Sequence, residues 1–246
     1  MVFFAAVAGC DLQAGDTKPK LMHTSTDAKA GRILDKAYQY LESLNMLSFR
    51  AKLVNEDLYE GKMVVELTHW VDVEIERPGH LRIDIVGDTR HRSYYLNEGI
   101  LTIFDPDLNL YGELRVPGGI DEALDDAFDH YRIKTPLANL LYSDISRRLK
   151  AKTEGHYFGV AYVGETLCDY IGFSDQRRSF QLWVAKGEKP FIRKYVIIDK
   201  STPVRLHSTV VIDWDNKGGL SEKIFQFFPP KGTRKIEVLA REGVEQ

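Results

Sequence analysis

Apolar and polar residues alternate through most of this chain, and the alternation predicts a protein built mainly of β-strands. Successive side chains of a strand point to opposite faces of the sheet. Val71, Val73 and Ile75 fall on one face, and Asp72 and Glu74 fall on the other. A strand of this kind has one buried and one wet face. Comparable stretches predict strands at 63–76, 81–85, 93–96, 100–104, 157–163, 166–173, 179–185, 191–199, 205–214 and 222–228.

Two stretches carry the three- and four-residue apolar spacing of helices instead. The first spans 27–45, where Leu34, Ala37 and Leu41 share one side of the helix. The second is the segment 117–146, which interrupts the strands. Within this segment, apolar spacing predicts one helix from Asp121 to Tyr131 and a shorter one at Pro136–Tyr142. Because this segment begins at Pro117-Gly118-Gly119 and has few residues for a core of its own, it is predicted to be a movable lid.

The order of these elements predicts the fold class. A helix comes first, then about six strands, the helical insertion and about six more strands. Hairpin-length connections imply antiparallel pairing, and a sheet this long curls. We therefore predict a mainly β (α+β) fold, with a curled antiparallel sheet or incomplete β-barrel of about 11 strands. The N-terminal helix and the insertion would cover its open side, and one domain would span 27–240.

The N-terminus carries a different signal. The apolar run VFFAAVA ends in small residues, and Cys10 follows directly after Val7-Ala8-Gly9. This resembles the bacterial lipobox, so residues 1–10 are interpreted as a partial lipoprotein signal with Cys10 as the lipidated residue. Secretory signals also carry a basic stretch before the apolar run, and Met1 is followed directly by that run. Either translation starts further upstream, or the match is accidental and the segment is a buried element with a core cysteine.

Residues 11–26 are polar and lack periodicity, which is typical of a tether. The net charge of −3 gives no basic footprint for nucleic acid. The sequence contains no Walker loop, GxGxxG, GxSxG, HExxH or CxxC pattern, which removes several large enzyme classes. Its seven histidines have no spacing typical of metal ligands. We therefore predict no catalytic residues, no metal and no cofactor.

Aromatic residues give the candidate binding site. The chain has twelve Phe, twelve Tyr and three Trp, mostly on predicted strands, and several strands carry bulky groups on both faces. One interpretation is a sheet whose two faces are both packed; the other is an apolar cavity for an acyl chain. The candidate ligand-binding residues are Trp70, Phe104, Leu124, Phe128, Leu140 and Trp183.

Four blocks carry a resemblance to a known family: RPGHLRIDIVGD at 77–88, the block 94–125, PLANLLYSD at 136–144, and the stretch 163–169. With these blocks the chain resembles a family of predicted periplasmic proteins of unknown function, over roughly residues 30–238. That family is similar in fold to the lipoprotein-localisation carriers LolA and LolB. The resemblance implies an incomplete β-barrel that holds acyl chains under a helical lid, and it implies no catalytic residues. Fold alone does not fix function.

Two functions are therefore expected. The first is a non-catalytic envelope module that binds an acyl lipid or a lipoprotein, located in the periplasm and anchored to the membrane through lipidated Cys10. The alternative is an envelope sensor or interaction protein that binds a partner protein through the same fold. An enzyme whose catalytic groups are dispersed in sequence is the third and least favoured reading. Nucleic acid is not an expected partner.

Overall fold

The structure is a computed structural model that describes residues 28–135, 137–148, 154–201, 203–215 and 221–240. Its strands form one twelve-stranded sheet. The first six strands are β1 (Met46–Tyr59), β2 (Met63–Glu76), β3 (His80–Gly87), β4 (His91–Asn97), β5 (Ile100–Asp105) and β6 (Leu110–Arg115). The other six are β7 (Glu154–Val163), β8 (Thr166–Ser174), β9 (Arg178–Ala185), β10 (Ile192–Asp199), β11 (His207–Trp214) and β12 (Arg234–Ile236). The helices are α1 (Ala28–Glu42), α2 (Ile120–Tyr131), α3 (Ala138–Leu141), α4 (Ile145–Arg148) and the 3-10 helix η1 (Glu222–Phe225).

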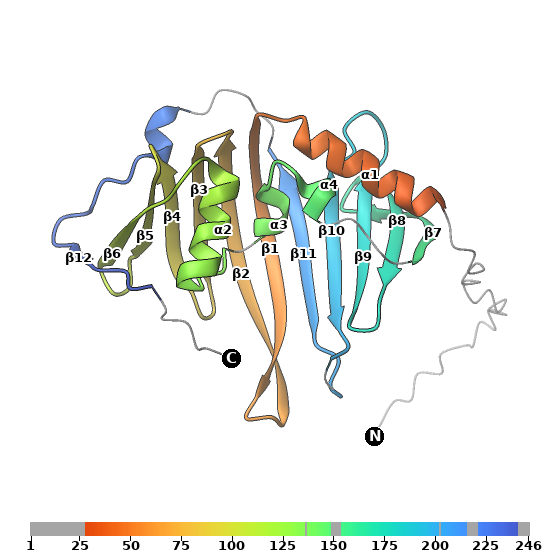
Figure 1. Ribbon diagram of the computed structural model, residues 1–246. Coiled ribbons are helices and arrows are strands. Elements are labelled where there is room, and N and C mark those ends of the chain that lie inside the picture. Colours follow the sequence, from red (N-terminus) through yellow and green to blue (C-terminus); the bar gives the residue numbers. More distant parts are fainter. Residues whose placement is uncertain (1–27, 136, 149–153, 202, 216–220, 241–246) are drawn as a thin grey trace, which may run out of the picture.

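The strands follow the order β12-β6-β5-β4-β3-β2-β1-β11-β10-β9-β8-β7. Strand β1 joins the two halves of the sheet, because it pairs with β2 on one side and with β11 on the other. Neighbouring strands are antiparallel, apart from β12, which lies parallel to β6. Because β12 and β7 are the two ends of this order, the sheet is curled but open (Figure 1). The predicted incomplete barrel is confirmed.

Strand register separates two faces of the sheet. Phe49 lies opposite Val73, and both are almost completely buried. The next residue, Arg50, points the other way and lies opposite Asp72, with which it forms an exposed ion pair. We term the first face the inner face and the second the outer face. Helices α2, α3 and α4 lie in front of the inner face in Figure 1, and α1 packs against β7, β8 and β9.

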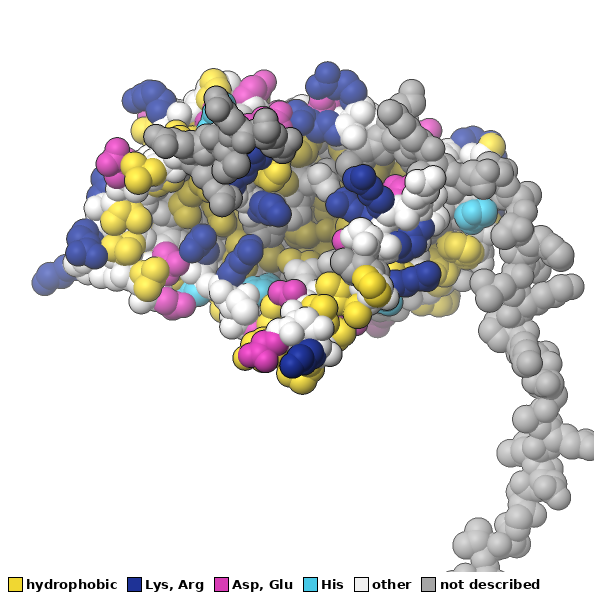
Figure 2. All heavy atoms as spheres, turned by 60° about the horizontal axis from the view of Figure 1, so that its bottom comes forward, with side chains coloured by type: hydrophobic (Ala, Val, Ile, Leu, Met, Phe, Trp, Pro, Cys, Tyr) yellow, Lys and Arg dark blue, Asp and Glu magenta, His cyan; other side chains and the backbone are white. Residues whose placement is uncertain are grey.

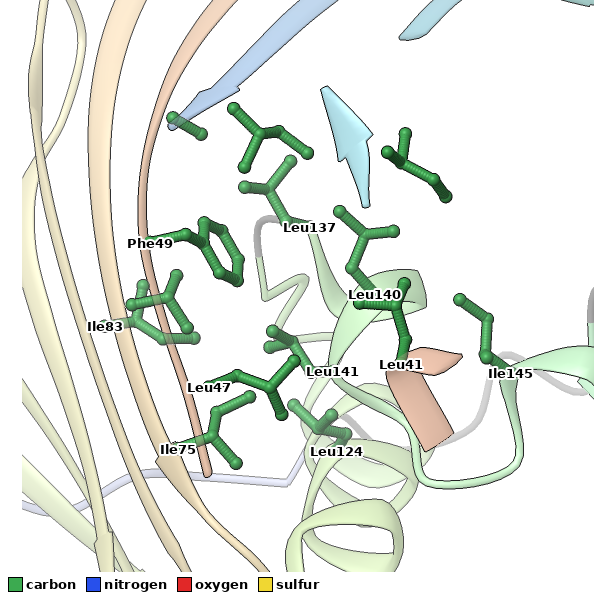
Figure 3. Close-up of a cluster of buried hydrophobic side chains, with 14 of the residues drawn as sticks. Leu41, Leu47, Phe49, Ile75, Ile83, Leu124, Leu137, Leu140, Leu141 and Ile145 are labelled. Carbon is green, nitrogen blue, oxygen red and sulfur yellow. The ribbon is translucent and has the colours of Figure 1, made fainter. Parts of the chain in front are cut away.

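The hydrophobic core lies between the inner face and these helices. Leu47 and Ile75 of the sheet are at most 1% exposed, and they meet Leu141 of α3, which is fully buried (Figure 3). Leu41 of α1 and Ile145 of α4 close the same cluster. Burying side chains of this size contributes about 1.5–3 kcal/mol each. The insertion is thus part of the main core rather than a body with a core of its own.

Arg77 fastens the insertion to the rest of the domain. Its guanidinium donates to the backbone oxygens of Leu41 (3.2 Å) and Leu44 at the end of α1, and to those of Leu141 (3.1 Å) and Tyr142 (3.2 Å) at the end of α3. Carbonyls at helix ends have no partner within the helix, so an outside donor satisfies them. Burial lowers the pKa of Arg77, while Asp121 and Glu42 act in the opposite direction; arginine nevertheless keeps its charge in proteins.

The predicted helices are confirmed with small shifts in their ends. The helix predicted for 27–45 is α1, and the helix predicted to begin at Asp121 is α2. The third predicted helix is α3, whose expected start at Pro136 lies outside the described residues. Each boundary moves by a few residues, which is the usual disagreement at helix ends.

The strand predicted for 222–228 is wrong. Its first part is the 3-10 helix η1, and the chain then runs over the outer face. Phe225 is fully buried and stacks on His80 at 5.4 Å between ring centroids. Phe227 lies about equally close to three rings of the outer face, those of Tyr95, Phe104 and Tyr111. Tertiary packing of two phenylalanines, rather than strand pairing, therefore explains the alternation in this segment.

Candidate functional site

The inner face is covered at one end and hollow at the other. The helices fill the end where α1 leads into β1 (Figure 3). Figure 2, viewed from the end where the β1–β2 hairpin projects, shows a hollow lined by apolar side chains, with Lys and Arg side chains around it. Several inner-face residues near this end are only partly buried. We term the following set the inner patch: Leu53, Leu67, Phe180, Tyr195 and Ile197.

Register brings the inner patch together from β1, β2, β9 and β10. Leu53 and Tyr195 both lie opposite Val210 of β11, on its two sides. Two residues further along β10, on the same face, Ile197 lies opposite Phe180. The patch is therefore one continuous strip across the sheet.

Two polar side chains lie within this strip. Asn55 lies between Leu67 and Ser208, and Ser208 in turn lies opposite Ile197. Asn55 and Ser208 are themselves only partly buried. An amide and a hydroxyl among apolar groups could orient the polar end of a mainly apolar ligand.

Two titratable groups of the inner face, Tyr195 and His69, are held neutral. Burial raises the pKa of Tyr195, so its hydroxyl stays protonated at physiological pH. His69, opposite Leu53, is 6% exposed, and its Nε2 lies 3.0 Å from the Thr89 hydroxyl. Burial lowers the pKa of His69, and Arg90 lowers it further, which favours the neutral imidazole. The hollow is thus suited to an uncharged, apolar group.

Above the patch, aromatic rings close the inner face. Trp214 lies 4.7 Å from Phe49 and 4.6 Å from Phe191, measured between ring centroids. Its indole nitrogen donates to the carbonyl of Ile192 at 2.9 Å. A partly buried indole that packs on two rings and has its N–H paired forms a fixed wall. The hollow therefore ends at these rings.

The structure does not bring the six predicted ligand-binding residues together. Leu124 and Leu140 are each 5% exposed and belong to the filled end of the core (Figure 3). Phe128 of α2 is 41% exposed.

The three predicted aromatic residues lie on the outer face. Trp70 lies opposite Lys52, next to the inner-face residue Val71. Phe104 packs against Phe227 at 5.3 Å. Trp183 belongs to this face as well, because it alternates with the buried residues of β9. The predicted lipidation site, Cys10, lies outside the described residues.

Among the described residues, no group of three or more His, Cys, Asp or Glu side chains is placed to hold a metal ion. No helix in this part of the chain has both the length and the apolar character needed to cross a membrane.

The chain belongs to the family of predicted periplasmic proteins DUF2092, whose sequence profile matches residues 30–239. This match confirms the resemblance found in the sequence. No curated protein matches the chain.

Two proteins of known structure share the fold. The lipoprotein LppX from Mycobacterium tuberculosis is 12% identical, with a TM-score of 0.50 over 79% of this chain and 100% of LppX. LprF from Mycobacterium bovis is 11% identical, with a TM-score of 0.51 over 81% of this chain and 99% of LprF. A LolA-superfamily protein from Nitrosomonas europaea gives 14% identity and a TM-score of 0.37 over 80% of this chain and 97% of that protein. At these identities the likeness concerns the fold alone.

Proposed function

We propose that this protein is a non-catalytic module of the cell envelope that holds an acyl chain of a lipid or lipoprotein against the inner patch. One observation carries the proposal: the inner face is sealed at one end, whereas toward the other end, where an apolar hollow opens, Leu53, Tyr195 and Phe180 are only partly buried. A family described as predicted periplasmic and a fold shared with the lipoprotein LppX support this setting.

The energetics favour a chain-like apolar ligand. Each methylene removed from water contributes about 0.8 kcal/mol. An acyl chain would cover Leu53 and Phe180 beside Tyr195 and His69, two titratable groups that are both neutral. Asn55 and Ser208 would then meet a carbonyl or hydroxyl of the ligand.

The test is co-purification. Protein purified from a bacterial envelope fraction should carry an acyl species detectable by native mass spectrometry, and delipidated protein should bind a fluorescent fatty acid. The mass of the bound species would also define the ligand class. Repeated purification without any acyl species, together with no fatty-acid binding, would contradict the proposal.

A second candidate function is binding of a partner protein, and the β1–β2 hairpin favours it. The hairpin projects beyond the rest of the sheet (Figure 1). Its end exposes Tyr59 (57%), Met63 (56%) and Val64 (45%). Exposed apolar groups gathered in this way are typical of contact surfaces. Crosslinking in cells from position 59 would test this function: a stoichiometric protein product that persists when the hollow is blocked supports it, and no product contradicts it.

We also propose that the module is anchored through Cys10 as a lipoprotein. Stable membrane anchoring requires two signals, such as two acyl chains, and a lipidated N-terminus carries more than two acyl chains. Expressed with a complete signal sequence, the wild-type protein should fractionate with membranes, and Cys10→Ser should move it to the soluble fraction. Failure of the wild type to incorporate labelled fatty acid would remove the anchor.

A further inference from the structure

The outer face carries a row of side chains that register aligns across seven neighbouring strands. Each member lies opposite the next on the adjacent strand, from β3 through β2, β1, β11, β10 and β9 to β8. We term this set the outer row: Val86, Trp70, Lys52, Val211, Lys194, Trp183 and Tyr170. An outer face in contact with water is expected to be polar, so a row of this composition is unusual.

One half of the outer row, from Val86 to Val211, is open to solvent. Val86 is 53% exposed, Trp70 is 49% exposed and Val211 is 38% exposed. These three residues lie on β3, β2 and β11, with Lys52 of β1 between the last two. The C-terminal segment covers Tyr95 and its neighbours further along the outer face but not these positions. Exposed large apolar groups that are contiguous mark a contact surface.

Charge distinguishes the outer row from its surroundings. Lys52 and Lys194 are its ionisable cations, and each ammonium faces a ring rather than a carboxylate: Lys52 lies 5.9 Å from the ring centre of Trp70, and Lys194 lies 4.5 Å from that of Trp183. The row contains no carboxylate.

At the neighbouring positions along the strands, the arginines are paired with carboxylates. Arg50 pairs with Asp72 at 2.6 Å, and Arg193 pairs with Asp213 at 3.2 Å. The arginines next to the row are therefore paired within the protein, whereas Lys52 and Lys194, the charged members of the row, face rings beside exposed apolar groups.

We propose that the outer row docks the protein on an anionic phospholipid surface. Tryptophan and tyrosine favour the interface of a bilayer, where an apolar body and a polar edge are both accommodated. Lysine stems lie along apolar surface while their ammonium groups reach anionic headgroups. Trp70 and Val211 would enter the interface, and Lys52 between them would bind phosphate groups.

Ring geometry argues against a glycan as the occupant. The rings of Tyr170 and Trp183 stack on each other, with centroids 4.4 Å apart and planes 10° apart. Their facing surfaces are occupied by one another, so they do not form the open platforms on which sugar rings stack. The curvature of the sheet limits contact with a flat membrane to the central strands, where the exposed members lie.

The docking site is tested with vesicles. The full chain carrying Cys10→Ser should sediment with vesicles of phosphatidylethanolamine and phosphatidylglycerol. In a background with both Trp183→Phe and Trp214→Phe, the emission of Trp70 should shift to shorter wavelength. Lys52→Glu combined with Lys194→Glu should weaken sedimentation at least about tenfold, since each lysine near an anionic surface contributes roughly a factor of five. Lys62→Glu, on the β1–β2 turn, is the matched control and should sediment like the parent.

Three results would overturn the proposal. They are no sedimentation of the parent protein, equal sedimentation with pure phosphatidylcholine vesicles, and an equal loss caused by Lys62→Glu. Thermal melting of each variant separates loss of docking from loss of folding. If the double variant does not fold, Val211→Glu alone replaces it, because Val211 is exposed and has the same expected effect on sedimentation.

Discussion

Replacing Arg77 by alanine is expected to lower the free energy of unfolding by about 3 kcal/mol, because it leaves buried backbone carbonyls without their donor. Those carbonyls belong to Leu41 and Leu44 on one side and to Leu141 and Tyr142 on the other. Urea denaturation of the delipidated protein measures the change as a shift of the midpoint.

Arg50→Ala is the matched control for Arg77→Ala. It also removes a hydrogen-bonded arginine, but the two hydrogen bonds of Arg50 go to the exposed carboxylate of Asp72. Surface ion pairs contribute little to stability. Arg50→Ala should therefore leave the midpoint almost unchanged. Equal shifts of the midpoint in the two variants would contradict the prediction that burial of the carbonyls bound by Arg77 causes the loss of stability.

The same substitution tests the predicted lid. We expect amide exchange to be faster in the insertion, from Pro117 to Ser146, than in the central strands, and slower once an acyl ligand is bound. Arg77→Ala should accelerate exchange around Leu141 more than in β2, because the fastening at the end of α3 is lost. Exchange in the insertion as slow as in β2 and unaffected by lipid would make it a structural cap.

The fold could be predicted from the sequence because most strands alternate. Val71, Val73 and Ile75 show their two-residue period directly, and the structure buries all three completely. The central strand β1 was absent from the predicted set, although Leu47, Phe49 and Ala51 carry the same alternation. The first half of β1 thus shows the alternation of a strand. Its second half is acidic and partly exposed, which weakens the pattern over the whole strand.

The candidate site could not be predicted in the same way. Aromatic size suggested Trp70 and Trp183 as ligand contacts, yet strand register places both on the outer face. Which face of a strand is concave depends on the curl of the whole sheet, and no single strand encodes it. Leu53 and Tyr195 are ordinary strand residues in the sequence, and only the pairing of β1, β11 and β10 brings them together.

The sequence likewise did not identify Arg77 as the residue that connects the ends of α1 and α3. In sequence it is one arginine before a proline, within a block that resembles the family. Its role depends on the ends of α1 and α3, which lie 36 and 64 residues away along the chain. Contacts of such separation follow from the tertiary structure alone.

Filling the hollow should abolish most of the proposed acyl binding. Ser208 lies in the middle of the inner patch, opposite Asn55 on one side and Ile197 on the other. Ser208→Trp would place an indole where the acyl chain is proposed to lie. Displacing two methylenes costs about 1.6 kcal/mol of binding, which corresponds to a loss of more than about tenfold in affinity.

Thr209→Trp provides the control, because the adjacent residue of the same strand points to the outer face, opposite Val54. It adds the same side chain at almost the same place in the sequence and should leave fatty-acid affinity within about a factor of two, as expected for a surface substitution. Titration of both variants with a fluorescent fatty acid measures the difference. If both variants keep the wild-type affinity, the ligand lies elsewhere. If both lose the same affinity, strand β11 is disturbed rather than the hollow filled. Only a selective loss in Ser208→Trp assigns the acyl chain to the inner face, since the two substitutions differ in the face that receives the indole.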